Sequence, residues 1–167
     1  MQPGVILDGA HNPDKMKALL DFVSKFEIRN ENFSNENPKY ETGSTRGVEK
    51  GDSVLTLRVG VTLVLAFKKG KDWKKMVDLL MKSLPVEEVI ATKFNAVTDT
   101  GAFAAVPAEE IGQYLESRVK SRVIKNSQEA VWEALNSKFL IPNSPVIVTG
   151  SLYLVGEVRA MWFESSF

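Results

Sequence analysis

The chain has 167 residues, of which 44% are hydrophobic, and its 21 lysine and arginine residues balance 21 aspartate and glutamate residues. This length suits one compact domain with a full core, and the balanced charge gives no net field that would favour nucleic acid or an anionic membrane. With no cysteine and a single histidine, the sequence excludes disulfides, thiolate zinc sites and all-histidine metal clusters.

The first predicted elements are a strand at residues 4–8 and a helix at residues 13–26. A short apolar run ends at Asp8, and Asn12-Pro13 then has the form of a helix start, with asparagine as N-cap and proline at the first helical position. The apolar residues Met16, Leu19, Leu20 and Val23 have the spacing of one helix face.

A polar stretch rich in Asn, Glu, Gly and Ser follows, and we expect residues 27–56 to form an insertion or long loop. Residues 54–59 and 61–67 are β-branched and apolar, which predicts strands, the second of them a buried central strand. Asp72 is then a candidate N-cap for a helix that ends before Pro85. That helix should bury one apolar face: Trp73, Met76, Val77 and Leu80.

The second half of the chain repeats the alternation of strands and helices. We expect strands at residues 88–91, 121–124 and 145–149. We expect three helices: one at residues 107–120, one that begins with Ser127 as its N-cap, and one at residues 152–162. The helix from Ser127 should face inward with Val131, Ala134, Leu135 and Phe139. Residues 92–106 have low periodicity and are predicted to be a loop.

This order predicts an α/β fold of one domain, with a three-layer, mostly parallel Rossmann-like sheet and helices on both faces. In such a fold, ligands bind at the carboxyl ends of the strands. Two polar turns fall at such ends, Asp8-Gly9-Ala10-His11 and Thr149-Gly150-Ser151, so they could line one crevice.

Each of these residues has a structural and a functional interpretation. Asp8 either accepts N–H groups of its own turn or accepts a ligand's hydroxyls. His11 is either a satisfied turn residue or a donor to a carboxylate or phosphate beside a helix N-terminus. Ser151 is an N-cap candidate, and the same helix start can also bind an anion.

The sequence contains no P-loop. Its only Gly-Lys pair is Gly70-Lys71, and Asp72 stands where serine or threonine is required. No Gly-x-Gly-x-x-Gly run follows a predicted strand either. The chain therefore has no Walker A phosphate cradle of its own.

Two runs together point to a family: Leu7-Asp8-Gly9-Ala10-His11-Asn12-Pro13, and the twelve residues from Val148 to Arg159, which begin Val-Thr-Gly-Ser-Leu-Tyr. They resemble the C-terminal domain of folylpolyglutamate synthase/dihydrofolate synthase, within the Mur ligase superfamily, and the resemblance extends over essentially the whole chain. The cell-wall Mur ligases usually carry tyrosine where Gly9 stands and lack the Gly-Ser-Leu-Tyr run, so the folate branch is preferred.

The resemblance implies an ATP-dependent ligase that phosphorylates a folate or pteroate carboxylate, after which the amine of L-glutamate attacks the acyl phosphate. It implies that Asp8, with Gly9 and Asn12, contacts ATP, and that Asp8 meets the ribose. It further implies that His11 is catalytic and lies near the incoming glutamate, and that Ser151 binds glutamate.

The same resemblance implies a larger, covalently linked N-terminal domain that carries the P-loop and the Mg²⁺ ligands. We therefore expect this chain alone to be inactive, with no metal site of its own. The expected partners are ATP, L-glutamate and folate or dihydropteroate, with neither nucleic acid nor membrane, and the expected location is cytoplasmic, or mitochondrial in a eukaryote.

Two alternatives stay open at this point. One is a Mur-type peptidoglycan amino-acid ligase domain. The other is a non-catalytic Rossmann-like module that binds a nucleotide or an amino acid without turning it over.

Overall fold

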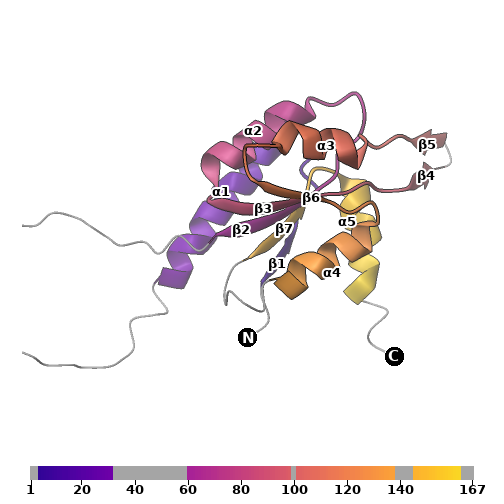
Figure 1. The fold of residues 1–167 in the computed structure, drawn as a ribbon. Helices are drawn as coiled ribbons and strands as arrows, with labels where there is room; N and C mark the ends of the chain where they lie inside the picture. The colour runs from indigo at the N-terminus through magenta and orange to yellow at the C-terminus, as the bar shows by residue number, and fades with distance from the viewer. Residues whose placement is uncertain (1–3, 32–59, 99–100, 138–144, 163–167) are drawn as a thin grey trace, which may run out of the picture.

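A computed structural model describes residues 4–31, 60–98, 101–137 and 145–162 of the chain. The main sheet contains β1 (Val5–Leu7), β2 (Val61–Leu65), β3 (Val86–Ala91), β6 (Lys120–Val123) and β7 (Val146–Thr149). These five strands are all parallel and lie in the order β1-β7-β2-β3-β6 (Figure 1). The predicted α/β class is confirmed.

Helices cover both faces of this sheet. One face carries α1 (Pro13–Glu31), α2 (Trp73–Ser83) and α3 (Ala108–Leu115), and the other carries α4 (Ser127–Ser137) and α5 (Leu152–Arg159), which continues into the short 3-10 helix η2 (Ala160–Trp162) (Figure 1). Side chains of β2 alternate between the two apolar clusters, with Leu63 and Leu65 on the α1 face and Val64 on the α4 face. The near-continuous apolar sequence of β2 and β7 is what a strand buried on both faces requires.

The predicted helix starts are confirmed at Asn12 but not at Ser127. Asn12 Oδ1 accepts the backbone N–H of Lys15 at 2.9 Å, as an N-cap should. At α4, Asn126 does the capping, because its Oδ1 accepts the N–H of Glu129 at 2.9 Å. Ser127 is already the first helical residue, and its hydroxyl is buried without a hydrogen bond among the described residues.

The prediction of a loop at residues 92–106 is wrong, because this segment contains an antiparallel hairpin. Strands β4 (Ala96–Thr98) and β5 (Gly101–Phe103) pair with each other and project from the body of the domain (Figure 1). The base of the hairpin is attached to the segment that follows β2, where the backbone N–H of Val106 donates to Phe67 O at 2.8 Å. Strands of three residues are too short to leave a clear alternation in the sequence.

Two helix ends also differ from the expectation. The helix predicted at residues 107–120 ends at Leu115, because the chain turns at Ser117 in a left-handed conformation with φ of 65° and enters β6 at Lys120. Helix α1 instead continues to Glu31, so the first five residues of the predicted insertion 27–56 are helical. The rest of that insertion, the strand predicted at residues 54–59, and Phe139 lie outside the described residues.

No helix within the described ranges is long and apolar enough to cross a membrane. The core depends instead on amphipathic helices such as α2, which buries Trp73, Met76, Val77 and Leu80 as predicted. Its N-cap position is Asp72, also as predicted, but the Asp72 side chain makes no capping hydrogen bond.

A polar clamp joins α2 to the end of α3. The hydroxyl of Tyr114 and the Arg118 guanidinium both donate to Asp78 Oδ1, each at 2.8 Å. Burial alone raises the pKa of Asp78, but the hydrogen bonds from Arg118 and Tyr114 outweigh it and hold this pKa below its ordinary value of 3.8. The charged carboxylate therefore stabilises the fold above that pH, and the contribution is lost as the pH falls through the lowered pKa.

We predict that Asp78→Asn lowers the free energy of unfolding at neutral pH by under about 1 kcal/mol, because both charged side chains remain exposed to solvent. The difference from the parent should shrink as the pH falls through the lowered pKa of Asp78, because the parent carboxylate then also becomes neutral. Urea unfolding at several pH values measures it. Asp21→Asn, an exposed change on α1, is the control and should have no such pH-dependent effect. An Asp78→Asn deficit that is equal at all pH values would contradict the clamp.

Candidate functional site

The first part of the candidate site is the turn that follows edge strand β1. Strand β1 pairs with β7 from Val5↔Val146 to Leu7↔Val148, and the N–H of Asp8 donates to Val148 O at 3.0 Å. Asp8 Oδ1 accepts the N–H of Ala10 at 2.7 Å, so the predicted structural role of this carboxylate is confirmed. Its second oxygen makes no hydrogen bond within the described ranges and keeps its capacity to accept.

His11 is half-buried on this turn, and its Nδ1 lies 2.9 Å from the carbonyl oxygen of Gly9. A carbonyl oxygen only accepts hydrogen bonds, so Nδ1 must carry a proton and donate it. The neutral ring then presents Nε2 as an acceptor, and the protonated ring presents it as a donor. The turn thereby fixes the orientation of the imidazole and leaves one nitrogen for another group.

The second part of the site is the end of β7. Gly150 has φ of 105°, and a Cβ there would lie 2.5 Å from Ala66 O and 2.7 Å from the Phe67 ring, so only glycine fits. The chain then enters α5, where Ser151 Oγ accepts the N–H of Tyr153 at 3.2 Å. Ser151 is therefore the N-cap, as predicted, and it is 2% exposed.

The structure brings the two turns together. A Cβ added at Gly9 would collide with the side chain of Leu152, so the loop that follows β1 packs directly on the start of helix α5. The Asp8 backbone is bonded to the strand that ends at Thr149, immediately before Gly150. Asp8, His11 and Ser151 thus come from two neighbouring turns at one edge of the sheet. The hydroxyl of Thr149, the last residue of β7, is fully buried and has no hydrogen-bond partner among the described residues.

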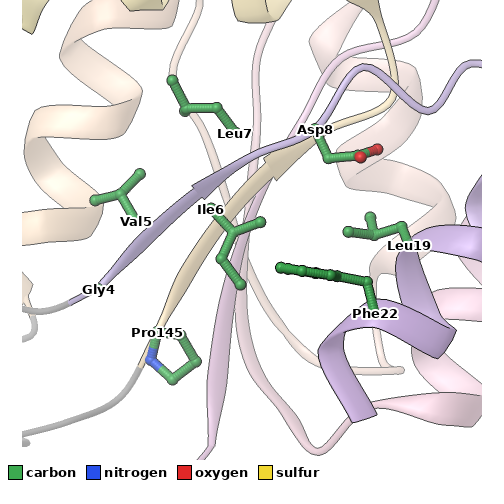
Figure 2. A pocket seen from close by; sticks show the side chains of 8 residues that line it. All are labelled: Gly4, Val5, Ile6, Leu7, Asp8, Leu19, Phe22 and Pro145. Atoms are coloured by element: carbon green, nitrogen blue, oxygen red, sulfur yellow. The ribbon is translucent and has the colours of Figure 1, made fainter. Parts of the chain in front are cut away.

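A pocket of about 470 Å³ runs along β1 from Pro145 to Asp8 (Figure 2). Figure 2 shows Leu19 and Phe22 of α1 facing Ile6 across it, with the Asp8 carboxylate beyond Leu7 at the carboxyl end of the strand. Its lining residues are Gly4, Val5, Ile6, Leu7, Asp8, Leu19, Phe22 and Pro145. Asp8 is the only charged residue among them, so the pocket suits an apolar group and not a phosphate.

No group of three or more His, Asp and Glu side chains in the described part of the chain could hold a metal ion. The groups that the candidate site does provide are hydrogen-bond acceptors, one imidazole and the N-termini of helices α1 and α5. Helix N-termini favour anions, so this edge of the sheet is suited to a ligand that carries carboxylates or phosphates next to hydroxyl groups.

Sequence reasoning missed one feature at this end of the sheet, the lysine-rich loop between β2 and α2. Sequence reasoning treats this loop only as an incomplete P-loop that precedes the N-cap candidate Asp72. The signal that could have found it is the density of lysine in residues 68–75.

A family model described as "Dihydrofolate synthetase, C-terminal domain" matches residues 45–161. Dihydrofolate synthetase of Saccharomyces cerevisiae is 27% identical over 156 residues, which cover 92% of this chain and 29% of the yeast protein. The chain therefore spans less than a third of this curated relative.

Solved structures show the same fold. E. coli FolC in complex with DHPP and ADP matches with a TM-score of 0.60 at 17% identity, covering 98% of this chain and 29% of that one. The bifunctional folylpolyglutamate synthase/dihydrofolate synthase of Yersinia pestis, complexed with AMPPNP and Mn ion, matches with a TM-score of 0.57 at 18% identity, covering 95% of this chain and 28% of that one.

We predict opposite effects for two glycine-to-alanine changes near this site. Gly150→Ala should lower the free energy of unfolding by about 1–3 kcal/mol, because its φ is positive and its Cβ would meet Ala66 O and Phe67. Gly156→Ala, within α5 and with nothing within 4 Å of its Cβ, should raise it by up to about 1 kcal/mol. Urea unfolding of both variants measures the difference, and equal stabilities would contradict the tight turn.

Proposed function

The chain belongs to the family of dihydrofolate synthetase C-terminal domains, and on that premise we propose that it is the C-terminal part of an ATP-dependent ligase. The full ligase joins L-glutamate to dihydropteroate, to a folate, or to both, through an acyl phosphate. The observation that carries this proposal is the direct packing of the Asp8–His11 turn on the start of α5. This contact joins an acceptor for hydroxyls, an oriented imidazole and two helix N-termini in one place.

The residues fit the nucleotide part of this proposal. Asp8 keeps one carboxylate oxygen beyond the bond to Ala10, and a ribose offers hydroxyl donors for it. Gly9 brings the turn close to α5, and Asn12 caps α1 through its side-chain oxygen and keeps its amide N–H groups. When bound, ATP supplies the phosphoryl group that activates the acceptor carboxylate.

The glutamate part of the proposal rests on His11 and Ser151. Nε2 of His11 is the nitrogen that its turn leaves unused, and in the protonated ring it can donate to a carboxylate of glutamate or of the activated substrate. The Ser151 hydroxyl accepts one N–H of α5 and can still donate its own proton to an anion at the helix start. Both residues orient and stabilise anionic groups.

The Mg²⁺ ligands and the phosphate cradle belong elsewhere in this proposal. The described residues hold no cluster for a metal ion, and the sequence contains no Walker A motif. We assign both functions to a covalently linked N-terminal domain, which would also supply much of the folate site. The relatives are more than three times longer than the alignment with this chain, which supports this assignment.

Of the two alternatives, the Mur-type peptidoglycan ligase is disfavoured, because the matching family model and the matched relatives belong to the folate branch. The non-catalytic binding module differs from our proposal in what the isolated chain does. A self-sufficient module binds nucleotide or amino acid tightly by itself. Half of a cleft binds each of them weakly, because most contacts come from the other domain.

We predict that the 167-residue chain alone shows no ATP-dependent incorporation of L-glutamate into dihydropteroate or folate. Radiolabelled glutamate measures this, with the complete yeast dihydrofolate synthetase as the positive control. Robust turnover by the chain alone would contradict the proposed division between two domains.

We predict separable kinetic defects when the chain is part of the complete ligase. Asp8→Asn should raise the KM for ATP about tenfold, because a charged acceptor is replaced by a weaker neutral one. His11→Ala should lower kcat on the order of 100-fold, with a smaller effect on the KM for ATP. Steady-state kinetics over each substrate tests both, and Asp21→Asn is the matched surface control on α1. Unchanged kinetics in both site variants would contradict the assigned roles.

A further inference from the structure

The loop between β2 and α2 is the most basic segment near the site. Residues 68–75 contain five lysines and one aspartate, whereas the whole chain is neutral. The lysines are Lys68, Lys69, Lys71, Lys74 and Lys75. Such a local excess of positive charge creates a strong field even in a protein without net charge.

This loop lies at the same edge of the sheet as the candidate site. Strands β2 and β7 pair up to Leu65↔Thr149, and a Cβ at Gly150 would touch Ala66 O and the Phe67 ring. The first lysine follows immediately after Phe67. The lysine-rich loop is thus next to the turn that leads into Ser151.

The loop is also held in place by the hairpin base. The backbone N–H of Lys69 donates to Ala104 O at 2.9 Å, and Lys68 forms an antiparallel bridge with Ala105. Together with the bond from Val106 to Phe67, these contacts fix the loop before any ligand arrives. A preorganised loop loses less conformational entropy on binding than a free one.

Three of the lysines lack a counter-charge. Lys74 is committed to two rings, since its Nζ lies 5.5 Å from the ring centroids of both Trp73 and Tyr114. Lys69, Lys71 and Lys75 are exposed and form no ion pair with the described residues.

The start of α2 adds to this positive potential. Its first turn contains no acidic residue, and the Asp72 side chain does not cap it. Lysine near a helix N-terminus is electrostatically unfavourable, because it faces the positive end of the helix dipole. The lysines and the uncapped N-terminus of α2 repel each other in the free protein, and a bound multivalent anion turns this repulsion into attraction.

We propose that Lys69, Lys71 and Lys75 form a subsite for the oligo-glutamate tail of a folate acceptor. This inference rests on the proposed ligase function and sharpens its substrate class, because a tail with one free carboxylate per residue can contact several lysines at once. Dihydropteroate has a single carboxylate and cannot use them in this way. The lysine ammonium groups, as mobile point charges, suit carboxylates at variable positions along a flexible chain.

The test is a titration of the ¹⁵N-labelled 167-residue chain with glutamate, tri-γ-glutamate and penta-γ-glutamate at low salt. The amide signals of residues 68–75 should shift, with an affinity that rises with chain length and falls as salt is added. Lys69→Gln, Lys71→Gln and Lys75→Gln should each weaken pentaglutamate binding about two- to fivefold. Lys82→Gln, in the last turn of the same helix, is the matched control and should leave the affinity unchanged.

Several results would overturn the inference. These are an affinity independent of chain length, an equal loss in Lys82→Gln, or tighter binding of tripolyphosphate than of a glutamate oligomer of similar charge. The last would assign the loop to nucleotide phosphates. A failure of the loop to bind pentaglutamate is distinguishable from a failure of the proposed function, because this binding requires neither catalysis nor a second domain. A complete ligase that uses dihydropteroate while this loop ignores pentaglutamate would contradict the subsite alone.

Discussion

The position of β7 between β1 and β2 is the constraint on which the site depends. Strand β7 comes late in the chain, yet it separates the first two strands of the sheet and pairs with both in parallel. Its carboxyl end therefore lies between the Asp8 turn and the end of β2. Gly150 allows this close approach, because a side chain there would meet Ala66 and Phe67. Without that contact, α5 could not begin beside Gly9, and the two polar turns would be unrelated loops.

Much of the fold was predictable because its signals are local. Proline and asparagine at the start of α1, the apolar face of α2 and the buried runs of β2 and β7 follow from sequence spacing alone. The failures have physical causes that spacing does not contain. Asn126 and Ser127 are both good caps, and only the path of the backbone selects the first. The end of α3 depends on Ser117 adopting a positive φ, which serine seldom does.

The candidate site was predictable to a different degree. Asp8, His11 and Ser151 were identified as residues at strand ends, and the structure brings their turns together. The strand order that does so is a non-local property, since β1 and β7 are far apart in sequence. The structure also shows that each residue already serves its own turn: Asp8 bonds Ala10, His11 bonds Gly9 and Ser151 caps α5. Structural and ligand-binding roles are compatible here, because each group retains one further donor or acceptor.

The lysine-rich loop shows that a chain with no net charge can still have a strong positive charge in one segment. Equal numbers of acidic and basic residues argued against an anionic macromolecular partner, and that argument concerns the molecule as a whole. At physiological ionic strength, exposed charges interact over a Debye length of only about 8 Å. A ligand at the edge of the sheet therefore senses the loop and the helix N-termini close to it, and hardly senses acidic residues on the far side. A substrate with several carboxylates gains from every nearby lysine, so local charge at the site has more bearing on substrate choice than the net charge of the chain.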